Sequence, residues 1–223
     1  MKFSKWMLMG TVAVSTLIFS CSNMNKTQKG AVIGTAGGAA VGGVIGRASG
    51  NTALGAIIGA AVGGATGAII GKQMDKQAEE MKKEIPDATV ERVGEGIIVE
   101  FSDKVLFDFD SYILSSTSKI NLDKLVTVLG KYPETNIEVQ GHTDSKGSTK
   151  YNQELSVKRA TAVTEYLKAH NILSSRLTVK GFGETAPKYT NDTEDGRAQN
   201  RRVEFLITAN EKMKADAKTQ AGQ

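Results

Sequence analysis

The sequence predicts an α+β fold, a β-α-β-α-β-β sandwich over residues 87–209, preceded by a glycine-rich helical hairpin over residues 30–71. Two observations predict it. Within 87–209, short stretches of alternating apolar and polar residues are separated by two longer stretches with apolar residues at helical spacing. Within 30–71 lie fourteen of the 24 glycines of the chain, with no aromatic residue, no proline and a single charge. A chain of uniform globular composition is therefore excluded.

The elements of the predicted domain can be placed in order. A β-hairpin opens it, because two alternating stretches flank the turn residues 94–96. The predicted strands and helices, with the helices on one side of the sheet, are strand 88–93, strand 97–101, helix 111–130, strand 136–141, helix 148–170, strand 176–182 and strand 202–208. Residues 210–223 are rich in Lys, Ala and Gln, and we expect them to form a disordered tail.

The glycine-rich block is an internal repeat. Glycines recur at every fourth position over 30–46 and again over 55–71. Because residues i and i+4 share a helix face, each copy would carry a smooth groove that allows close helix packing. We expect two antiparallel helices, and residues 72–86 should continue the second one as a solvated helical spacer ending at Pro86. A flexible linker is the alternative. Insertion into a membrane and pairing with a second copy are left open.

The first 20 residues have the pattern of a secretory signal peptide, with two lysines before an apolar run over 7–19. The run is too short to span a bilayer comfortably. It ends at Ile18-Phe19-Ser20-Cys21, which resembles the lipobox of bacterial lipoproteins. The resemblance implies that Cys21 is lipidated and begins the mature chain, with 21–29 as a linker. An ordinary signal peptide with an incidental cysteine is the alternative.

Composition argues against several classes of protein. The chain has one cysteine, two histidines and a net charge of +4. These counts leave little material for a metal centre, and the charge is too small to argue for a nucleic-acid partner. The sequence also lacks a Ser-His-Asp order and zinc-ligand spacing, so we expect no enzyme, no metal and no cofactor.

Seven short motifs occur in order in the predicted domain: Phe107-Asp-Phe-Asp110, Gly141-His-Thr-Asp144, Tyr151-Asn152, Leu155-Ser156, Arg159-Ala160, Gly181-Phe-Gly-Glu184 and Asn200-Arg-Arg-Val203. Together they closely resemble the OmpA-like peptidoglycan-binding domain, from near Val105 to Thr208. With the lipobox and the glycine block, the whole chain resembles glycine-zipper lipoproteins of the YiaD and Pal type. The resemblance implies a non-enzymatic domain that binds peptidoglycan.

The side-chain end of diaminopimelate in a peptidoglycan stem carries a free ammonium and a free carboxylate. A receptor for this zwitterion needs one anion and one fork-shaped cation. Asp144 follows a predicted strand, and Arg159 lies on the helix face that points back toward the loop of Asp144. We therefore expect Asp144 to hold the ammonium and Arg159 the carboxylate, and the resemblance assigns the same roles. A simple ion pair between Asp144 and Arg159 is the alternative.

By motif position, the resemblance adds further residues that line or border the pocket: Phe109, Asp110, Thr143, Asn152, Leu155 and Arg202. His142 is expected to orient the loop rather than to contact a ligand.

These inferences predict an outer-membrane lipoprotein that tethers the membrane to the cell wall, with the domain facing the periplasm. Ser22 follows the cysteine, and by resemblance to enterobacterial sorting this favours the outer membrane. The alternative is an envelope assembly or oligomerisation factor that acts through the glycine-rich hairpin.

Overall fold

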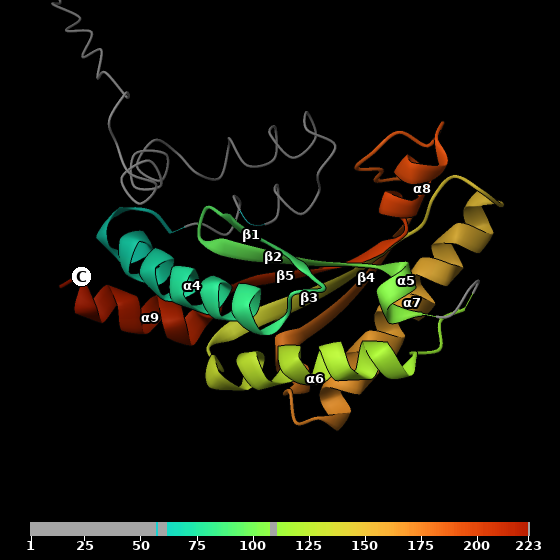
Figure 1. The fold of residues 1–223 in the computed structure, drawn as a ribbon. Helices are drawn as coiled ribbons and strands as arrows, with labels where there is room; N and C mark the ends of the chain where they lie inside the picture. Colours follow the sequence, from blue (N-terminus) through green and yellow to red (C-terminus); the bar gives the residue numbers. More distant parts are fainter. Residues whose placement is uncertain (1–56, 58–61, 108–110, 223) are drawn as a thin grey trace, which may run out of the picture.

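The computed structural model describes residues 57, 62–107 and 111–222 (Figure 1). Several predicted features lie outside these residues. They are the signal peptide, Cys21, the first glycine-rich arm, residues 55–56 and 58–61 of the second arm, and the two pocket residues Phe109 and Asp110.

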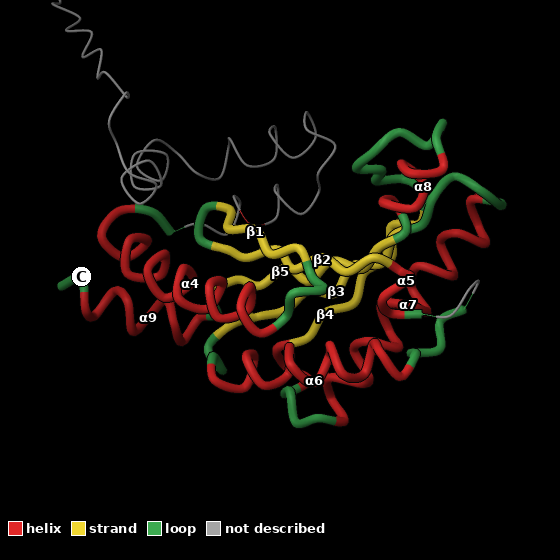
Figure 2. The backbone as a smooth tube through the Cα atoms, viewed as in Figure 1, coloured by secondary structure: helices red, strands yellow, loops and turns green. Residues whose placement is uncertain are grey.

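A mixed sheet of five strands forms the centre of the domain (Figure 2). The strands are β1 (Thr89–Val93), β2 (Gly96–Ser102), β3 (Thr135–His142), β4 (Leu177–Gly183) and β5 (Arg202–Ala209). Their order in the sheet is β1-β2-β5-β3-β4; β3 and β4 are parallel, and the other neighbours are antiparallel. Each strand lies within one residue of the stretch that alternation predicted, so the predicted strands are confirmed.

The described helices are α4 (Gly64–Glu84), α5 (Asp103–Leu106), α6 (Ser116–Lys131), α7 (Thr149–Ala169), a 3-10 turn η1 (Ser174–Arg176), α8 (Glu194–Asn200) and α9 (Glu211–Gln220). Helix α7 agrees with the prediction. Helix α6 begins five residues later than predicted, because Ser115 caps it by accepting a hydrogen bond from the Ser118 amide at 3.0 Å. The short helices α5 and α8 were not predicted.

Helices α6 and α7 cover one face of the sheet, as predicted, and α4 and α9 cover the same face beside them (Figure 1). Strand β5 shows how alternation sets the two faces. Val203, Phe205 and Ile207 are fully buried in the main core under these helices. Leu206 instead belongs to a separate small cluster with Ile57. Arg202 and Glu204 share the parity of Leu206 and therefore lie on the face away from the helices.

The expectation of a solvated spacer over 72–86 is wrong. Most of these residues belong to α4, and Met74, Ala78 and Met81 are fully buried in the core. These three residues follow one another at intervals of one helical turn and form a narrow apolar stripe along α4. Such a stripe can be buried when neighbouring elements cover the helix on both sides of it. Helix α4 contacts β1, α6 and α9, so it is part of the domain.

The expectation of a disordered tail over 210–223 is also wrong for residues 211–220, which form α9. Asn210 caps this helix by accepting a hydrogen bond from the Met213 amide at 3.0 Å. Met213 and Ala217, one turn apart, are buried and join the main core beside α4. Both ends of the domain therefore extend beyond the predicted boundaries 87–209.

Two glycines allow α7 to lie very close to the sheet. A Cβ at Gly141 would be 2.1 Å from the Ser156 carbonyl oxygen, and one at Gly181 would be 2.8 Å from the Val157 nitrogen. Side chains at these positions would push the helix away. The close contact holds the N-terminal half of α7 beside the ends of β3 and β4, where several motif residues meet.

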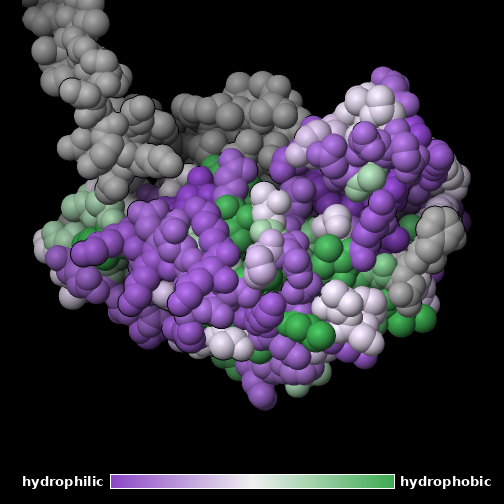
Figure 3. Space-filling view, viewed as in Figure 1, coloured by the Kyte–Doolittle hydropathy of each residue, from purple (hydrophilic) through white to green (hydrophobic). Residues whose placement is uncertain are grey.

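The visible outer surfaces of α4 and α9 are largely hydrophilic (Figure 3). This agrees with helices that bury only one stripe. Within the described part of the chain, none of the helices has the length and apolar character needed to cross a membrane.

Candidate binding site

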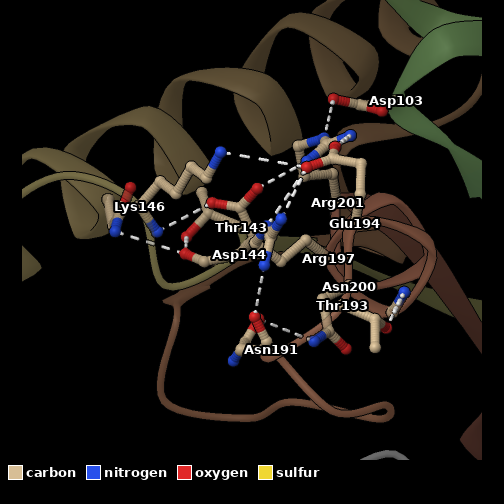
Figure 4. Close-up of polar contacts among 12 residues, drawn as sticks. Asp103, Thr143, Asp144, Lys146, Asn191, Thr193, Glu194, Arg197, Asn200 and Arg201 are labelled. Carbon is tan, nitrogen blue, oxygen red and sulfur yellow. Dashed lines mark hydrogen bonds and ion pairs between the residues drawn. The ribbon is translucent and has the colours of Figure 1, made fainter.

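The motif residues meet in a cavity of about 670 Å³ at the edge of the domain where α5, the loop after β3, the start of α7 and α8 come together. Figure 4 shows the charged residues on one side of it. The lining residues are Asp103, Lys104, Phe107, Thr143, Asp144, Lys146, Tyr151, Asn152, Leu155, Arg159, Glu194 and Arg201. Five of the eight predicted pocket residues are among them.

Asp144 is held by both of its carboxylate oxygens. Oδ2 lies 2.5 Å from Nη1 of Arg201, and Oδ1 accepts a hydrogen bond from the Lys146 amide at 2.9 Å (Figure 4). The Asp144 carbonyl accepts from the Thr143 hydroxyl at 3.0 Å and from the Asn152 side chain at 3.3 Å. The loop is thus fixed by its own residues and by α7, and the carboxylate faces the cavity.

Arg159 projects from α7 toward the same cavity. Its Nε donates to the Ser111 carbonyl at 3.0 Å, and its Nη2 lies 3.6 Å from Oδ2 of Asp103. The guanidinium carbon is 5.2 Å from the centre of the Phe107 ring, so the group also makes a cation–π contact. The guanidinium therefore lies against the Phe107 ring, and its contacts with Ser111 and Asp103 fix its orientation.

Asp103 and Arg201 connect these two residues. Oδ2 of Asp103 lies 3.4 Å from Nε of Arg201, which completes a row of alternating charges: Asp144, Arg201, Asp103 and Arg159. Burial raises the pKa of Asp103, and the two arginines only partly oppose this. Arg201 also lies 3.3 Å from Glu194, whose pKa is lowered by its hydrogen bonds to Arg197 and Arg201.

Among the described residues, Asp144 and Arg159 do not form the simple ion pair that was the alternative. Asp144 pairs with Arg201, while Arg159 pairs with Asp103. The two predicted residues therefore lie in one pocket but have different partners there.

Arg202 does not line the pocket, although it was predicted to border it. Its side chain lies on the face of the sheet away from the helices, where Nε is 2.7 Å from Oε1 of Glu204. It also donates to the carbonyls of Asn200 at 3.1 Å and Ala186 at 3.3 Å. Its neighbour in the chain, Arg201, lies within the charged row instead, between Asp144 and Asp103. The alternation of β5 could have indicated this, because Val203 and Phe205 must face the core.

Besides Arg201, sequence reasoning missed six lining residues: Asp103, Lys104, Phe107, Lys146, Tyr151 and Glu194. Asp103 and Glu194 lie at the starts of the short helices α5 and α8, which no periodic pattern marked. Tyr151 stood in a quoted motif and could have been found there.

His142 lies behind the loop on the other face. It is buried and its ring stacks on Phe182 with a centroid distance of 5.2 Å. Burial above all, together with the positive charges of Arg202 and Lys188, lowers the pKa of His142 to about 2. The imidazole is therefore neutral at physiological pH and serves packing, in line with the expected structural role.

The described residues offer no cluster of three or more His, Cys, Asp or Glu side chains suited to a metal ion. The pocket instead combines fixed cations, fixed carboxylates and an apolar floor, an arrangement that suits a small ligand carrying both charges.

Comparisons with known proteins agree with the motifs. Residues 106–201 match the model of the OmpA family, and residues 1–75 match that of the YMGG-like Gly-zipper. Outer membrane porin F of Pseudomonas fluorescens is 45% identical over 105 residues, which cover 47% of this chain and 32% of that protein. The chain thus spans about a third of the length of this relative.

Two lipoproteins are matched over more of their length. The putative lipoprotein YfiB of Escherichia coli is 37% identical over 108 residues, covering 48% of this chain and 68% of that protein. The peptidoglycan-associated lipoprotein of Rhizobium meliloti is 32% identical over 109 residues, covering 49% of this chain and 62% of that protein.

Solved structures show the same fold. A putative MotB like protein from Desulfovibrio vulgaris aligns with a TM-score of 0.58 and 26% identity, over 63% of this chain and 93% of that one. The cell wall anchor of the T6SS from Pseudomonas aeruginosa aligns with a TM-score of 0.53 and 28% identity, over 61% and 96%. The fold, the ordered motifs and the extent of the match to YfiB lead to one conclusion: the chain belongs to the OmpA family, whose peptidoglycan-binding domains are not enzymes, and joins such a domain to a YMGG-like glycine zipper.

Proposed function

We propose that this protein is an outer-membrane lipoprotein that binds the diaminopimelate of peptidoglycan stem peptides and so tethers the outer membrane to the cell wall. The proposal has two parts: a binding site in the pocket, and a lipid anchor at Cys21.

The row of alternating charges is the observation that carries the binding site. A zwitterion can join this row without leaving any buried charge unpaired, because its ammonium adds to a carboxylate and its carboxylate adds to a guanidinium. Asp144 is the proposed partner of the ammonium, and Arg159 that of the carboxylate. When the ammonium approaches Asp144, Arg201 keeps two other acidic partners, Asp103 and Glu194.

The apolar part of the pocket supports the same ligand. Phe107 and Leu155 line the cavity beside Arg159, and Tyr151 is half exposed at its mouth. The side chain of diaminopimelate carries its charged end on a chain of methylene groups, which these residues can cover while the charges pair.

The tether rests on the lipobox ending at Cys21 and on the names of the relatives. Two of these relatives are lipoproteins, one of them peptidoglycan-associated. A protein held at two points needs only modest affinity for each stem peptide, because the anchor raises the effective concentration of the other partner.

Co-sedimentation of the detergent-solubilised full chain with cell-wall sacculi tests the binding site. Asp144→Asn and Arg159→Gln each remove one charge of the row, and we expect each to weaken binding by about tenfold or more. Lys158→Gln is the matched control, because Lys158 is an exposed neighbour of Arg159 on α7 that does not line the cavity. Sacculi with lysine in place of diaminopimelate should bind poorly, because lysine lacks the carboxylate.

Undiminished binding by both charge variants, with melting curves like that of the parent protein, would rule out the assigned site. The tether is tested separately in cells. Cys21→Ser should release the protein from the membrane and leave its binding to sacculi intact. The alternative is an assembly or oligomerisation factor that acts through the glycine-rich repeat. It is favoured if disruption of the repeat damages the envelope and Asp144→Asn does not.

A further inference from the structure

The turn between β1 and β2 holds the segment that leads into α4. Both carboxylate oxygens of Glu95 accept backbone hydrogen bonds there: Oε2 from the Val62 amide at 2.7 Å, and Oε1 from the Gly63 amide at 2.8 Å. These amides lie just before the start of α4, where helix donors lack partners within the helix and the helix dipole is positive. Glu95 therefore caps α4 from a distant element.

Three glycines of the repeat region make this contact possible. Gly63 and Gly64 have φ of 70° and 63°, values that other residues adopt only with strain. Gly67 is buried within α4, and a Cβ there would lie 2.2 Å from Oε1 of Glu95. Gly67 belongs to the four-residue glycine period, yet it faces the β1–β2 turn.

Gly71 provides an internal comparison. It is the next glycine of the same period and lies in the same helix, but the nearest atom to a Cβ there, Nη2 of Arg92, is 3.9 Å away. That is an ordinary contact, so a methyl group fits at Gly71 and does not fit at Gly67 while Glu95 is in place.

Two further contacts connect the same surfaces. Arg92 of β1 lies 2.8 Å from Asp75 of α4 and donates to the Gly71 carbonyl at 3.3 Å. On the far face of the sheet, Ile57 is buried against Ile98 and touches Gly96 so closely that a Cβ there would be 2.7 Å from it. The hairpin thus contacts the end of the glycine-rich region on both faces of the sheet.

We propose that the β1–β2 hairpin is a docking surface for the end of this chain's own glycine-rich repeat, with Glu95 as its anchor. Gly63 and Gly67 serve this docking rather than a groove between two zipper helices. The described end of the repeat, residues 57 and 62–71, then forms one body with the pocket-bearing domain. This inference is independent of what the pocket binds.

Gly→Ala substitutions in the full chain, solubilised in detergent, test the proposal. Alanine in place of glycine inside a helix is stabilising, so Gly71→Ala should raise the melting temperature by about 2–4 °C. Gly67→Ala should lower it, because its methyl group displaces the Glu95 carboxylate. Glu95→Ala should speed hydrogen exchange at Val62 and Gly63 by about tenfold or more, since it removes both hydrogen bonds.

The double variant decides the case even if Gly67→Ala alone folds poorly. In the Glu95→Ala background the clash is absent, so adding Gly67→Ala should raise the melting temperature as Gly71→Ala does. The proposal is overturned if Gly67→Ala and Gly71→Ala act alike in the presence of Glu95. It is equally overturned if Gly67→Ala still destabilises after Glu95 is removed, or if exchange at Val62 and Gly63 does not respond to Glu95→Ala.

Discussion

Arg201 and Arg202 are neighbours in the chain, but they belong to two differently constructed charge clusters. In the pocket, Arg201 is 22% exposed and lies near three carboxylates, so it can lose one partner and keep others. Behind the sheet, Arg202 is 5% exposed and its close partner Glu204 is 2% exposed. Solvent access and the number of partners, rather than residue type, therefore separate charges that can exchange with a ligand from charges that only maintain structure.

The largest effect is expected from breaking the buried pair. Arg202→Met leaves Glu204 without its close cation in a site that water hardly reaches, and we expect a loss of about 3–5 kcal/mol in the free energy of unfolding. Urea denaturation measures it. The double variant Arg202→Met/Glu204→Leu removes both charges and should recover much of the loss. A single variant as stable as the parent would show that the cluster is open to water.

An intermediate effect is expected from His142, which lies beside Arg202 on the same face. Its pKa of about 2 in the folded state is far below the ordinary value of 6.5. Below pH 6.5 the unfolded chain binds a proton that the folded protein excludes, so stability present above that pH is lost as the pH falls. From pH 6.5 to 5 this loss should reach about 2 kcal/mol.

Urea denaturation at a series of pH values tests this expectation, with His142→Phe as the comparison. Phenylalanine keeps a ring against Phe182 but cannot be protonated, so the variant should lose less stability over this interval. Equal slopes for the two proteins would mean that other groups cause the acid sensitivity. The interval stops at pH 5 because the raised pKa of Asp103 contributes with the opposite sign at lower pH.

The smallest effect is expected from Arg201→Gln in the pocket. Arg201 is more exposed than Arg202 (22% against 5%), and one of its three partners, Glu194, is 62% exposed, so water can partly replace the lost cation and we expect a loss of about 1 kcal/mol in the free energy of unfolding. Measured beside Arg202→Met under the same conditions, it compares the two clusters directly. A loss as large as that of Arg202→Met would mean that the pocket charges also serve mainly to hold the fold.

Most of the fold could be predicted because alternation and helical spacing are local properties of the chain. All five strands and α7 follow from them. What could not be predicted depends on contacts between distant elements. The apolar stripe of α4 is narrow and surrounded by charges, and α9 offers only Met213 and Ala217; each is buried because the other helix covers its flank.

The site was predicted in part for a similar reason. Asp144 and Arg159 stand in motifs, and the strand–loop–helix order brings them into one pocket. Asp103 could not be identified, because it enters through a four-residue helix with no sequence signal. The choice of Arg202 over Arg201 was avoidable, since the parity of Val203 and Phe205 in β5 places Arg202 on the other face.

The burial of α4 also determines how the domain would carry a mechanical load. The first residues of α4 and the pocket lie at opposite ends of the molecule, and the strands run lengthwise between them (Figure 1). In the proposed tether, a pull between the membrane anchor and the cell wall would therefore act along the strands, β2 and β5 among them. The hydrogen bonds of this antiparallel pair lie across the strands, so they would bear the force together in shear instead of opening one after another.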